Sequence, residues 1–467
     1  MTLLKSEQVN GKSVTPKNSD MNFRFSLFIL IAFTLSCKND ADIYPVKFSK
    51  TPDYSQVFPD EQIRSITINV GQENWDKIQK DMEWRTARKF GSSTAIPGVT
   101  PPVGVGLDAV FGDPIFVEAE VKQDGNTWSK VGFRLKGNAS LNGSWRSGIY
   151  KLPFKIKFDE WEDQNPDTKN QRFYGFQELS FAPSYGDDSF LKEKLLTQLF
   201  RNSGVMACKV AYYKVHINFG QGLKYCGIYQ AIETVEEHMV EVQTGKKVGN
   251  VYKPESNMQQ FVTNQFEKQN NQTAADYTDV KQLITILNSP LRISDRPQWK
   301  KELEAIFDVK EFLRYLAVNN TVGNWDSYGV LTHNYFIANT DGVLHWIPFD
   351  LNLSFQTRGG SNNSRFALSM EMKEVTNQWP LIRYVIDDPE YFAYYKSAVK
   401  EFIQKQFNPT TMGDYIKKHK AILQPYLSGT GVEAPPYSHL RSPQNFETAI
   451  TSLEKYINER YQTALSF

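Results

Sequence analysis

Asp326, Asn334 and Asp350 are the residues of this chain whose types and spacing best suit chemistry. Carboxylate and amide oxygens are the ligands that hard cations such as Mg²⁺ prefer. Phosphoryl transfer needs phosphates held by a metal, together with a carboxylate that orients or deprotonates the attacking hydroxyl. Asp and Asn are also common in turns for local reasons, so ordinary turn residues are the alternative interpretation.

A hairpin would bring these three side chains together. Residues 334–339 and 343–349 are strand-like, and Asp341-Gly342 between them is typical of a tight turn. With the turn centred on Asp341, Asp350 lies beside Asn334 at the open end of the hairpin. Asp326 lies in the loop that leads into the first strand of the hairpin. We therefore expect all three to converge at one end.

The composition limits the classes of partner. The chain has 467 residues, and its 53 basic and 52 acidic residues give a net charge of +1, which creates no strong field for nucleic acid. Aromatic residues make up 13%, which predicts a substantial core. The length suits two or three average domains or one large unit with insertions.

The N-terminal segment predicts export. Phe25–Leu35 is an apolar run that follows Arg24 and is too short to span a bilayer comfortably. The sequence Thr34-Leu35-Ser36-Cys37 resembles a bacterial lipoprotein lipobox, in which Cys37 would carry the lipid. We expect residues 1–37 to be a signal peptide with lipobox, and the protein to be an outer-membrane or cell-surface lipoprotein. An uncleaved anchor or a buried apolar strand is the alternative.

Regular patterns divide the rest of the chain into four parts. Residues 38–61 contain three prolines among polar residues and are predicted to be a tether. Residues 62–233 are rich in strand patterns, and residues 234–425 contain the hairpin and several helices. Residues 426–467 are predicted to be a C-terminal helical tail. The fold class that follows is α+β, with a β-rich N-terminal part and a helical C-terminal part.

The elements that must position the hairpin are predicted from alternation and helical spacing. Strands are expected at residues 64–70, 115–122, 128–136, 150–158, 210–218 and 223–233, and helices at 74–82, after the Asp187-Asp188-Ser189 cap, at 235–244 and at 309–319. Residues 137–148 are predicted to be a connecting turn region.

Four segments in this order resemble the CotH kinase family, the spore-coat-type secreted kinases with an atypical protein-kinase-like fold. They are Gly132–Ser140, similar to G-x-R-x-R-G-N-x-S; Leu179–Phe181 with Asp188–Glu193, similar to L-N-L…D-x-S-x-x-R-E; Tyr225–Glu233, similar to Y-x-G-x-Y-x-x-x-E; and Trp325–Asn352, similar to N-x-D…N-Y…P-W-D-x-D. The resemblance covers about residues 62–425 and implies a kinase domain over that range.

The resemblance implies roles for the acidic residues. Asp350 would be the main metal ligand, and Asp326 the acceptor-side base or orienting residue. Asn334 would be a second metal ligand, a role inferred from the hairpin register. Asn352 stands where the family often has a second aspartate, and an amide brings no charge, so weaker metal binding follows.

The resemblance also implies a phosphate side. Lys151 or Lys155 would meet the ATP phosphates, and Glu193 would pair with that lysine. Lys136, Asn138 and Ser140 are further candidates for the cofactor, since a Gly-Asn-x-Ser turn offers N–H groups and a hydroxyl to an anion. Alternatively, Lys151 and Lys155 lie on a solvated strand face, and Glu193 is an ordinary surface glutamate. Turn chemistry alone would explain the Gly-Asn-x-Ser segment equally well.

Two further residues stay open. Glu233 ends a strand and could bind metal, a sugar or Lys253. Lys253 lies in a Gly-Asn-x-Tyr-Lys run similar to one in the family, and no role is assigned to it. The His residues show no ligand spacing for zinc.

These observations favour an exported, lipid-anchored kinase that uses ATP and Mg²⁺, with Mn²⁺ as a substitute, to phosphorylate a protein Ser or Thr hydroxyl. Its expected partners are a protein substrate and the membrane, through Cys37, and no nucleic acid. The alternative is a non-catalytic, kinase-like surface lipoprotein that binds glycan or a protein. A phosphotransferase or nucleotidyltransferase acting on a small molecule would use the same metal site.

Overall fold

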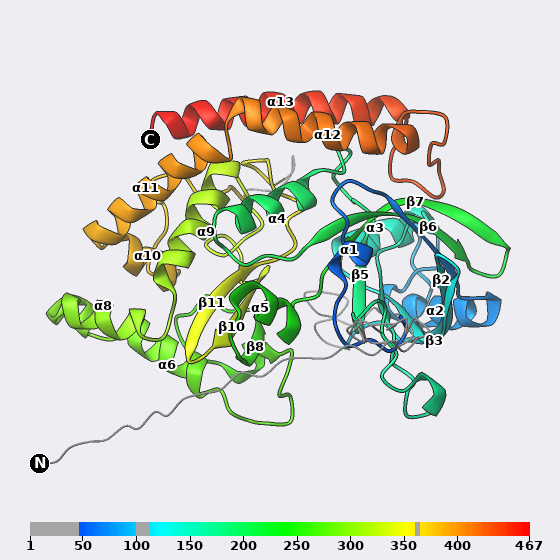
Figure 1. Cartoon of the computed structure of the whole chain (residues 1–467), viewed down its shortest axis with the longest axis horizontal. Helices are drawn as coiled ribbons and strands as arrows, with labels where there is room; N and C mark the ends of the chain where they lie inside the picture. The colour runs from blue at the N-terminus through cyan, green and yellow to red at the C-terminus, as the bar shows by residue number, and fades with distance from the viewer. Residues whose placement is uncertain (1–45, 100–111, 360–364) are drawn as a thin grey trace, which may run out of the picture. The chain divides into compact units, whose positions relative to one another are not determined.

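The structure is a computed structural model that describes residues 46–99, 112–359 and 365–467. The expected α+β class is confirmed, because strands dominate the N-terminal part and helices the C-terminal part (Figure 1). The predicted signal peptide, Cys37 and most of the Gly/Pro-rich segment at 91–112 lie outside the described residues.

Seven strands of the described chain close into a barrel in the order β1-β2-β3-β4-β5-β7-β6. Their bounds are β1 Arg64–Asn69, β2 Val117–Gln123, β3 Asn126–Leu135, β4 Phe154–Lys157, β5 Glu178–Ala182, β6 Val210–Asn218 and β7 Leu223–Ile232. Neighbours pair antiparallel, except that β1 closes the barrel by pairing parallel with β6, Ile66 opposite Val215.

Alternation along the strands produces the barrel core. In β2, Val117, Ala119 and Val121 are buried, while the residues between them are exposed or half-buried. Large aromatic side chains fill the interior: Trp128, Phe133, Phe154, Phe181, Tyr213 and Tyr229. An interior packed this densely is a scaffold, so chemistry must occur at its rim.

A second sheet, with the order β11-β10-β8-β9, carries the hairpin. It consists of β8 Val248–Pro254, β9 Phe266–Lys268, β10 Tyr335–Thr340 and β11 Val343–Pro348. One face contributes Tyr252, Ile337 and Trp346 to the helical core. The other face contributes Val251, Phe336 and Ile347 to a cluster that includes Val210 and Ile232 of the barrel. The sheet is therefore packed directly against the barrel.

The α-helices are α1 Tyr54–Val57, α2 Gln72–Thr86, α3 Ala139–Ser147, α4 Lys192–Asn202, α5 Glu237–Thr244, α6 Thr278–Leu287, α7 Leu291–Ser294, α8 Arg296–Glu304, α9 Val309–Val322, α10 Pro380–Ile386, α11 Pro389–Lys405, α12 Pro409–Leu427 and α13 Pro443–Leu465. Buried α9 is central to the helical part, since it packs against α11, α13, α4 and β11.

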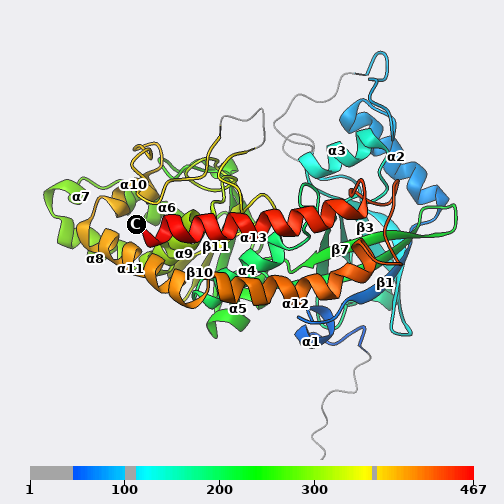
Figure 2. The ribbon, with the colours of Figure 1, turned by 90° about the horizontal axis from the view of Figure 1, so that it is seen from above.

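The C-terminal helices correct one predicted boundary. The division at residue 425/426 falls inside α12, and α13 runs back along α12 as an antiparallel partner (Figure 2). Phe446, Ile450, Leu453 and Ile457 of α13 are buried in the main helical core. Residues 426–467 are therefore an integral part of the folded unit and not a separate tail.

The predicted tether at 38–61 is also corrected over its described part. Asp53 caps α1, and the Tyr54 hydroxyl donates to the buried Glu233 carboxylate at 2.5 Å. Asp60 forms an ion pair with Lys194 of α4 at 2.9 Å. Residues 46–61 are thus held against the barrel side of the molecule by specific contacts.

Two local predictions were also wrong. Residues 139–147 form α3, although Asn142, Gly143 and three serines are poor helix formers, and buried Leu141 and Trp145 hold the helix in place. The strand expected at 150–158 is shorter than predicted, because β4 covers only Phe154–Lys157.

In the described part of the chain, no helix is both long and apolar enough to cross a bilayer.

Candidate functional site

The expected hairpin is confirmed, and its open end collects the three predicted polar residues. Tyr335 lies opposite Pro348, and the Phe349 N–H donates to the Asn334 carbonyl at 3.1 Å. The Asn334 side-chain amide donates to the Asp326 backbone carbonyl at 2.9 Å. Asn334 and Asp350 have positive φ angles of 67° and 55°, which Asn and Asp tolerate better than most residues. The strained backbone is typical of a functional site.

Asp326 and Asp350 act on each other electrostatically. Burial, and then the Asp350 charge, raise the pKa of Asp326 to about 6, while His333 opposes the shift. Asp326 is 9% exposed, and Asp350 is exposed. Two carboxylates that repel each other, beside the oxygen of an amide, form a donor set that fits a hard cation.

Glu193 connects α4 to the same end of the hairpin. Its carboxylate accepts the N–H of Leu351, directly after Asp350, at 2.7 Å. The predicted N-cap at residues 187–189 is wrong, because α4 begins after Leu191, which has no side-chain cap bond; the Asp187 carboxylate nevertheless accepts the Lys192 N–H at 3.0 Å. Burial, and then the Asp350 charge, raise the pKa of Glu193 to about 8. The hydrogen bond from the Leu351 N–H and the Lys136 charge act in the opposite direction and lower it.

Lys136, directly after β3, is the lysine that faces this carboxylate group. Its ammonium donates to the Ser180 hydroxyl at 3.2 Å and lies 5.8 Å from the centre of the Phe349 ring. Burial, and then the Lys155 charge, lower the pKa of Lys136 to about 8, while Asp350 opposes the shift. Lys136, Glu193 and Asp350 therefore form one interacting group.

The pairing predicted for Lys151 or Lys155 with Glu193 is not what the structure shows. Buried Lys151 forms an ion pair with buried Glu433 at 2.5 Å, which leaves it no access to a ligand. Lys155 forms an ion pair with Glu178 at 2.7 Å, although it lies near enough to affect Lys136. Strand alternation could not separate these lysines, because it fixes a side chain's face and not its partner.

The CotH kinase protein family matches residues 134–464 of the sequence. The chain belongs to the CotH kinase family. Inner spore coat protein H of Bacillus subtilis (strain 168) is 20% identical over 307 residues, covering 63% of this chain and 78% of that protein. Spore coat protein homolog 1 of Rhizopus delemar is 21% identical over 255 residues, or 52% of this chain and 41% of that protein. The chain therefore spans less than half of the fungal relative, and it is a kinase-like protein by family.

Two solved structures resemble parts of this CotH family member. A chain of the Shewanella oneidensis MR-1 HipA–HipB toxin–antitoxin complex with operator DNA has a TM-score of 0.33 and 12% identity, covering 62% of this chain and 58% of that one. The Helicobacter pylori proinflammatory kinase CtkA has a TM-score of 0.26 and 8% identity, covering 62% and 91%. The family assignment rests on the sequence match.

In this CotH family member, the predicted anion-binding turn leads into a helix. Lys136, Gly137 and Asn138 connect β3 to α3, so Lys136 stands three residues before Ala139, the first residue of the helix. Asn138 is exposed, and Ser140 is half-buried in the first turn. The partial positive charge of a helix N-terminus suits phosphate, so the placement fits the predicted role.

Asn352 and Glu233 take different positions. The Asn352 amide donates to the Tyr185 carbonyl at 3.1 Å, two residues beyond Asp350, where its oxygen remains a possible ligand atom. Glu233 is 1% exposed and accepts the Tyr54 hydroxyl and the Lys209 N–H. Glu233 therefore anchors α1, and the suggested pairing with Lys253 is wrong.

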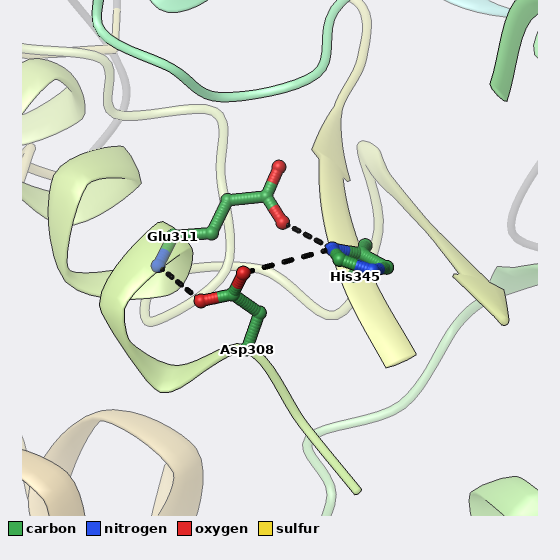
Figure 3. A group of neighbouring side chains, drawn as sticks. All are labelled: Asp308, Glu311 and His345. Atoms are coloured by element: carbon green, nitrogen blue, oxygen red, sulfur yellow. Dashed lines mark hydrogen bonds and ion pairs between the residues drawn. The ribbon is translucent and has the colours of Figure 1, made fainter. Parts of the chain in front are cut away.

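A separate group of two carboxylates and a histidine joins the start of α9 to β11 of the hairpin, where the sequence spacing indicated no site. Asp308, Glu311 and His345 present atoms that all lie within 4.8 Å of one another (Figure 3). Each has protein partners: His345 contacts Glu311 at 2.6 Å and Thr340 at 2.9 Å, and Glu311 also accepts the Met206 N–H. The group fixes α9 to β11 as a hydrogen-bond network.

Helix α13 supports the loop that carries Asp326, a contact that the sequence did not predict. Arg460 donates to the carbonyls of Thr321 and Asn320 at 2.9 and 2.7 Å, and the Tyr456 hydroxyl donates to the Val322 carbonyl at 3.1 Å. These are end carbonyls of α9, which lack helical partners. The contacts join residues more than 130 positions apart, and no local pattern could signal them.

Proposed function

We propose that this chain is an exported, Mg²⁺-dependent kinase that transfers the γ-phosphate of ATP to a Ser or Thr hydroxyl of a protein. Mn²⁺ would replace Mg²⁺, because both take oxygen ligands. The observation that carries the proposal is the convergence of Lys136, Glu193, Asp326 and Asp350 from four separate segments.

Each of these residues suits one part of phosphoryl transfer. The Lys136 ammonium and the N-terminus of α3 supply positive charge for the phosphates. Glu193 holds the backbone after Asp350 in place. Asp350, with the oxygens of Asn334 and Asn352, would hold the cation, which when bound neutralises charge on the phosphates.

Asp326 is suited to the acceptor side. With a pKa of about 6, it is mainly ionised at neutral pH and can accept a proton. The hydroxyl oxygen of the acceptor would form a bond to the γ-phosphorus as the bond from that phosphorus to the β-phosphate oxygen breaks. The hydroxyl proton passes to Asp326, and ADP leaves.

Export and anchoring are part of the same proposal. The apolar run at Phe25–Leu35 and the lipobox-like Cys37 support a lipid-anchored protein at the outer membrane or cell surface. The names of the two relatives, both spore coat proteins, favour a surface location. Mass spectrometry of the protein from its native membrane should find diacylated Cys37 at the N-terminus; an unmodified N-terminus upstream of Cys37 would refute the anchor.

The decisive test compares matched aspartate-to-asparagine variants. Purified protein with Mg²⁺ and γ-labelled ATP should label protein Ser or Thr, and Asp350→Asn or Asp326→Asn should reduce labelling by at least about 100-fold. Asn keeps the shape and tolerates the positive φ of Asp350. Asp341→Asn, at the turn end of the same hairpin, is the control and should retain activity.

Other outcomes separate the alternatives. Labelling that survives both site variants would refute the proposed site. Absence of both Mg²⁺-dependent ATP binding and transfer would favour a non-catalytic surface protein that binds glycan or a protein, for which the uncharged Asn352 is the supporting observation. Label recovered only in a small molecule would favour the small-molecule phosphotransferase.

A further inference from the structure

Lys253 lies on the face of the second sheet that contacts the barrel. Side chains alternate along β8, and Val251 belongs to the cluster shared with Phe336 and Ile347. Lys253, two residues further, faces the same way. Phe349 packs against this cluster and contacts Phe336, with ring centres 5.0 Å apart. Because β8 pairs antiparallel with β10 and Tyr252 lies opposite Ile337, Lys253 lies beside Phe336, near the open end of the hairpin.

The same end of the sheet also faces Lys136. The Lys136 ammonium lies 5.8 Å from the centre of the Phe349 ring, and Lys253 is close enough to act electrostatically on it. Lys155 belongs to the same group of like charges. Gathering several ammonium groups is unfavourable unless anions offset their repulsion.

Burial tends to raise the pKa of Asp113, but the charges of Arg134, Lys155 and Lys253 lower it, so Asp113 partly offsets the Lys253 charge without an ion pair to it. Lys155 is already paired with Glu178, and Asp113 with Arg134 at 2.6 Å. Across the described residues, the Lys253 ammonium has no hydrogen bond or ion pair with protein. The missing partner by itself would fit a solvated surface lysine. Lys253 is instead half-buried and close to the like charge of Lys136.

We propose that Lys253 is a second phosphate-binding lysine, which contacts the terminal phosphates of the nucleotide from the side of β8 while Lys136 contacts them from the end of β3. This inference rests on the proposed function. The nucleotide would then lie between Lys136 of the barrel and Lys253 of the second sheet. It also makes the site selective for nucleotides with several phosphates, since two ammonium groups attract a triphosphate more strongly than a monophosphate.

The test measures nucleotide affinity by calorimetry, with Lys253→Met beside Lys247→Met. Lys247 is exposed and directly precedes the opposite end of β8, so it is the matched control. Mg²⁺ with a non-hydrolysable ATP analogue should bind about tenfold more weakly to Lys253→Met. The loss should be smaller for AMP and should diminish as salt is raised. The Lys247→Met variant should bind like the wild type.

The outcomes are distinguishable. Equal affinity of the wild type and Lys253→Met for the analogue would overturn this inference and leave the proposed function standing. An equal loss for AMP and the analogue would also overturn it, because the lysine would then not act on the terminal phosphates. If the wild type fails to bind the analogue with Mg²⁺, both the inference and the proposed function fail. Thermal unfolding of both variants checks that the fold is retained.

Discussion

The carboxylate of Glu193 accepts the backbone N–H of Leu351 at 2.7 Å, across 158 positions of sequence. This single bond ties the start of α4 to the residue after Asp350. It fixes the backbone of the candidate metal ligand from outside the hairpin, while Lys136 faces the same carboxylate from the barrel. Glu193 therefore links the two parts of the molecule at the site.

Glu193→Gln should stabilise the protein at alkaline pH. The folded-state pKa of Glu193 is raised from 4.5 to about 8, so the stability associated with its bound proton is present below about pH 4.5 and lost as pH rises through about 8. Gln stays neutral and can still accept the Leu351 N–H. The gain above pH 8 should be at most on the order of 5 kcal/mol.

Urea denaturation at pH 4.5 and 8.5 measures that difference. The two proteins should be similar at pH 4.5 and differ at pH 8.5, while exposed Glu241→Gln on α5 should change neither value. A destabilised Glu193→Gln at pH 8.5 would mean that the charged carboxylate contributes net stability.

Mn²⁺ binding should weaken as pH falls through about 6. Burial and Asp350 raise the pKa of Asp326 to about 6, so below that pH Asp326 is mainly protonated and no longer offers its charge to a cation. Electron paramagnetic resonance gives the Mn²⁺ affinity between pH 5 and 8. Asp326→Asn should remove this inflection and Asp341→Asn should keep it; an unchanged inflection in Asp326→Asn would assign the titration to another group.

Arg460→Met should loosen the loop that carries Asp326. The variant removes donors from the carbonyls of Asn320 and Thr321, and hydrogen bonds from a charged group contribute about 1.5–3 kcal/mol each. We expect slower phosphate transfer with little change in nucleotide affinity, since the nucleotide contacts lie on other segments. Single-turnover kinetics and calorimetry separate the two effects. The control is Lys455→Met, 80% exposed on α13; a loss confined to nucleotide affinity would contradict the prediction.

Removing one partner of the ion pair between Lys151 and Glu433 should strongly destabilise the protein. Both side chains are fully buried, and the Glu433 carboxylate also accepts the Ile228 N–H at 2.6 Å. Glu433→Ala leaves a buried ammonium without its partner, which costs about 3–5 kcal/mol.

Urea denaturation of single and double variants tests this pair. Lys151→Met combined with Glu433→Ala should cost less than the sum of the two single changes. The partly exposed pair of Lys157 and Glu160 is the comparison, and Glu160→Ala should cost less than about 1 kcal/mol. Equal costs for Glu433→Ala and Glu160→Ala would contradict the prediction.

The hairpin shows what local sequence can predict. The Asp341-Gly342 turn and the alternation on either side depend on neighbouring residues, so the meeting of Asn334 and Asp350 followed from the pattern. The helical spacing after residue 189 was similarly local, and it placed Glu193 correctly on a helix, although the N-cap is Leu191 and not one of residues 187–189. In α3, by contrast, burial of Leu141 and Trp145 overrides weak helix propensity.

The sequence alone determined most of the barrel strands, the hairpin and the family, because each depends on neighbouring residues or on motif order. Only the tertiary structure decided which lysine faces Glu193. Lys136, Lys151 and Lys155 all lie in predicted strands, but the tertiary structure sets Lys151 against Glu433, 282 positions away, and leaves Lys136 at the site. Such a choice depends on long-range packing and desolvation, which no local spacing records.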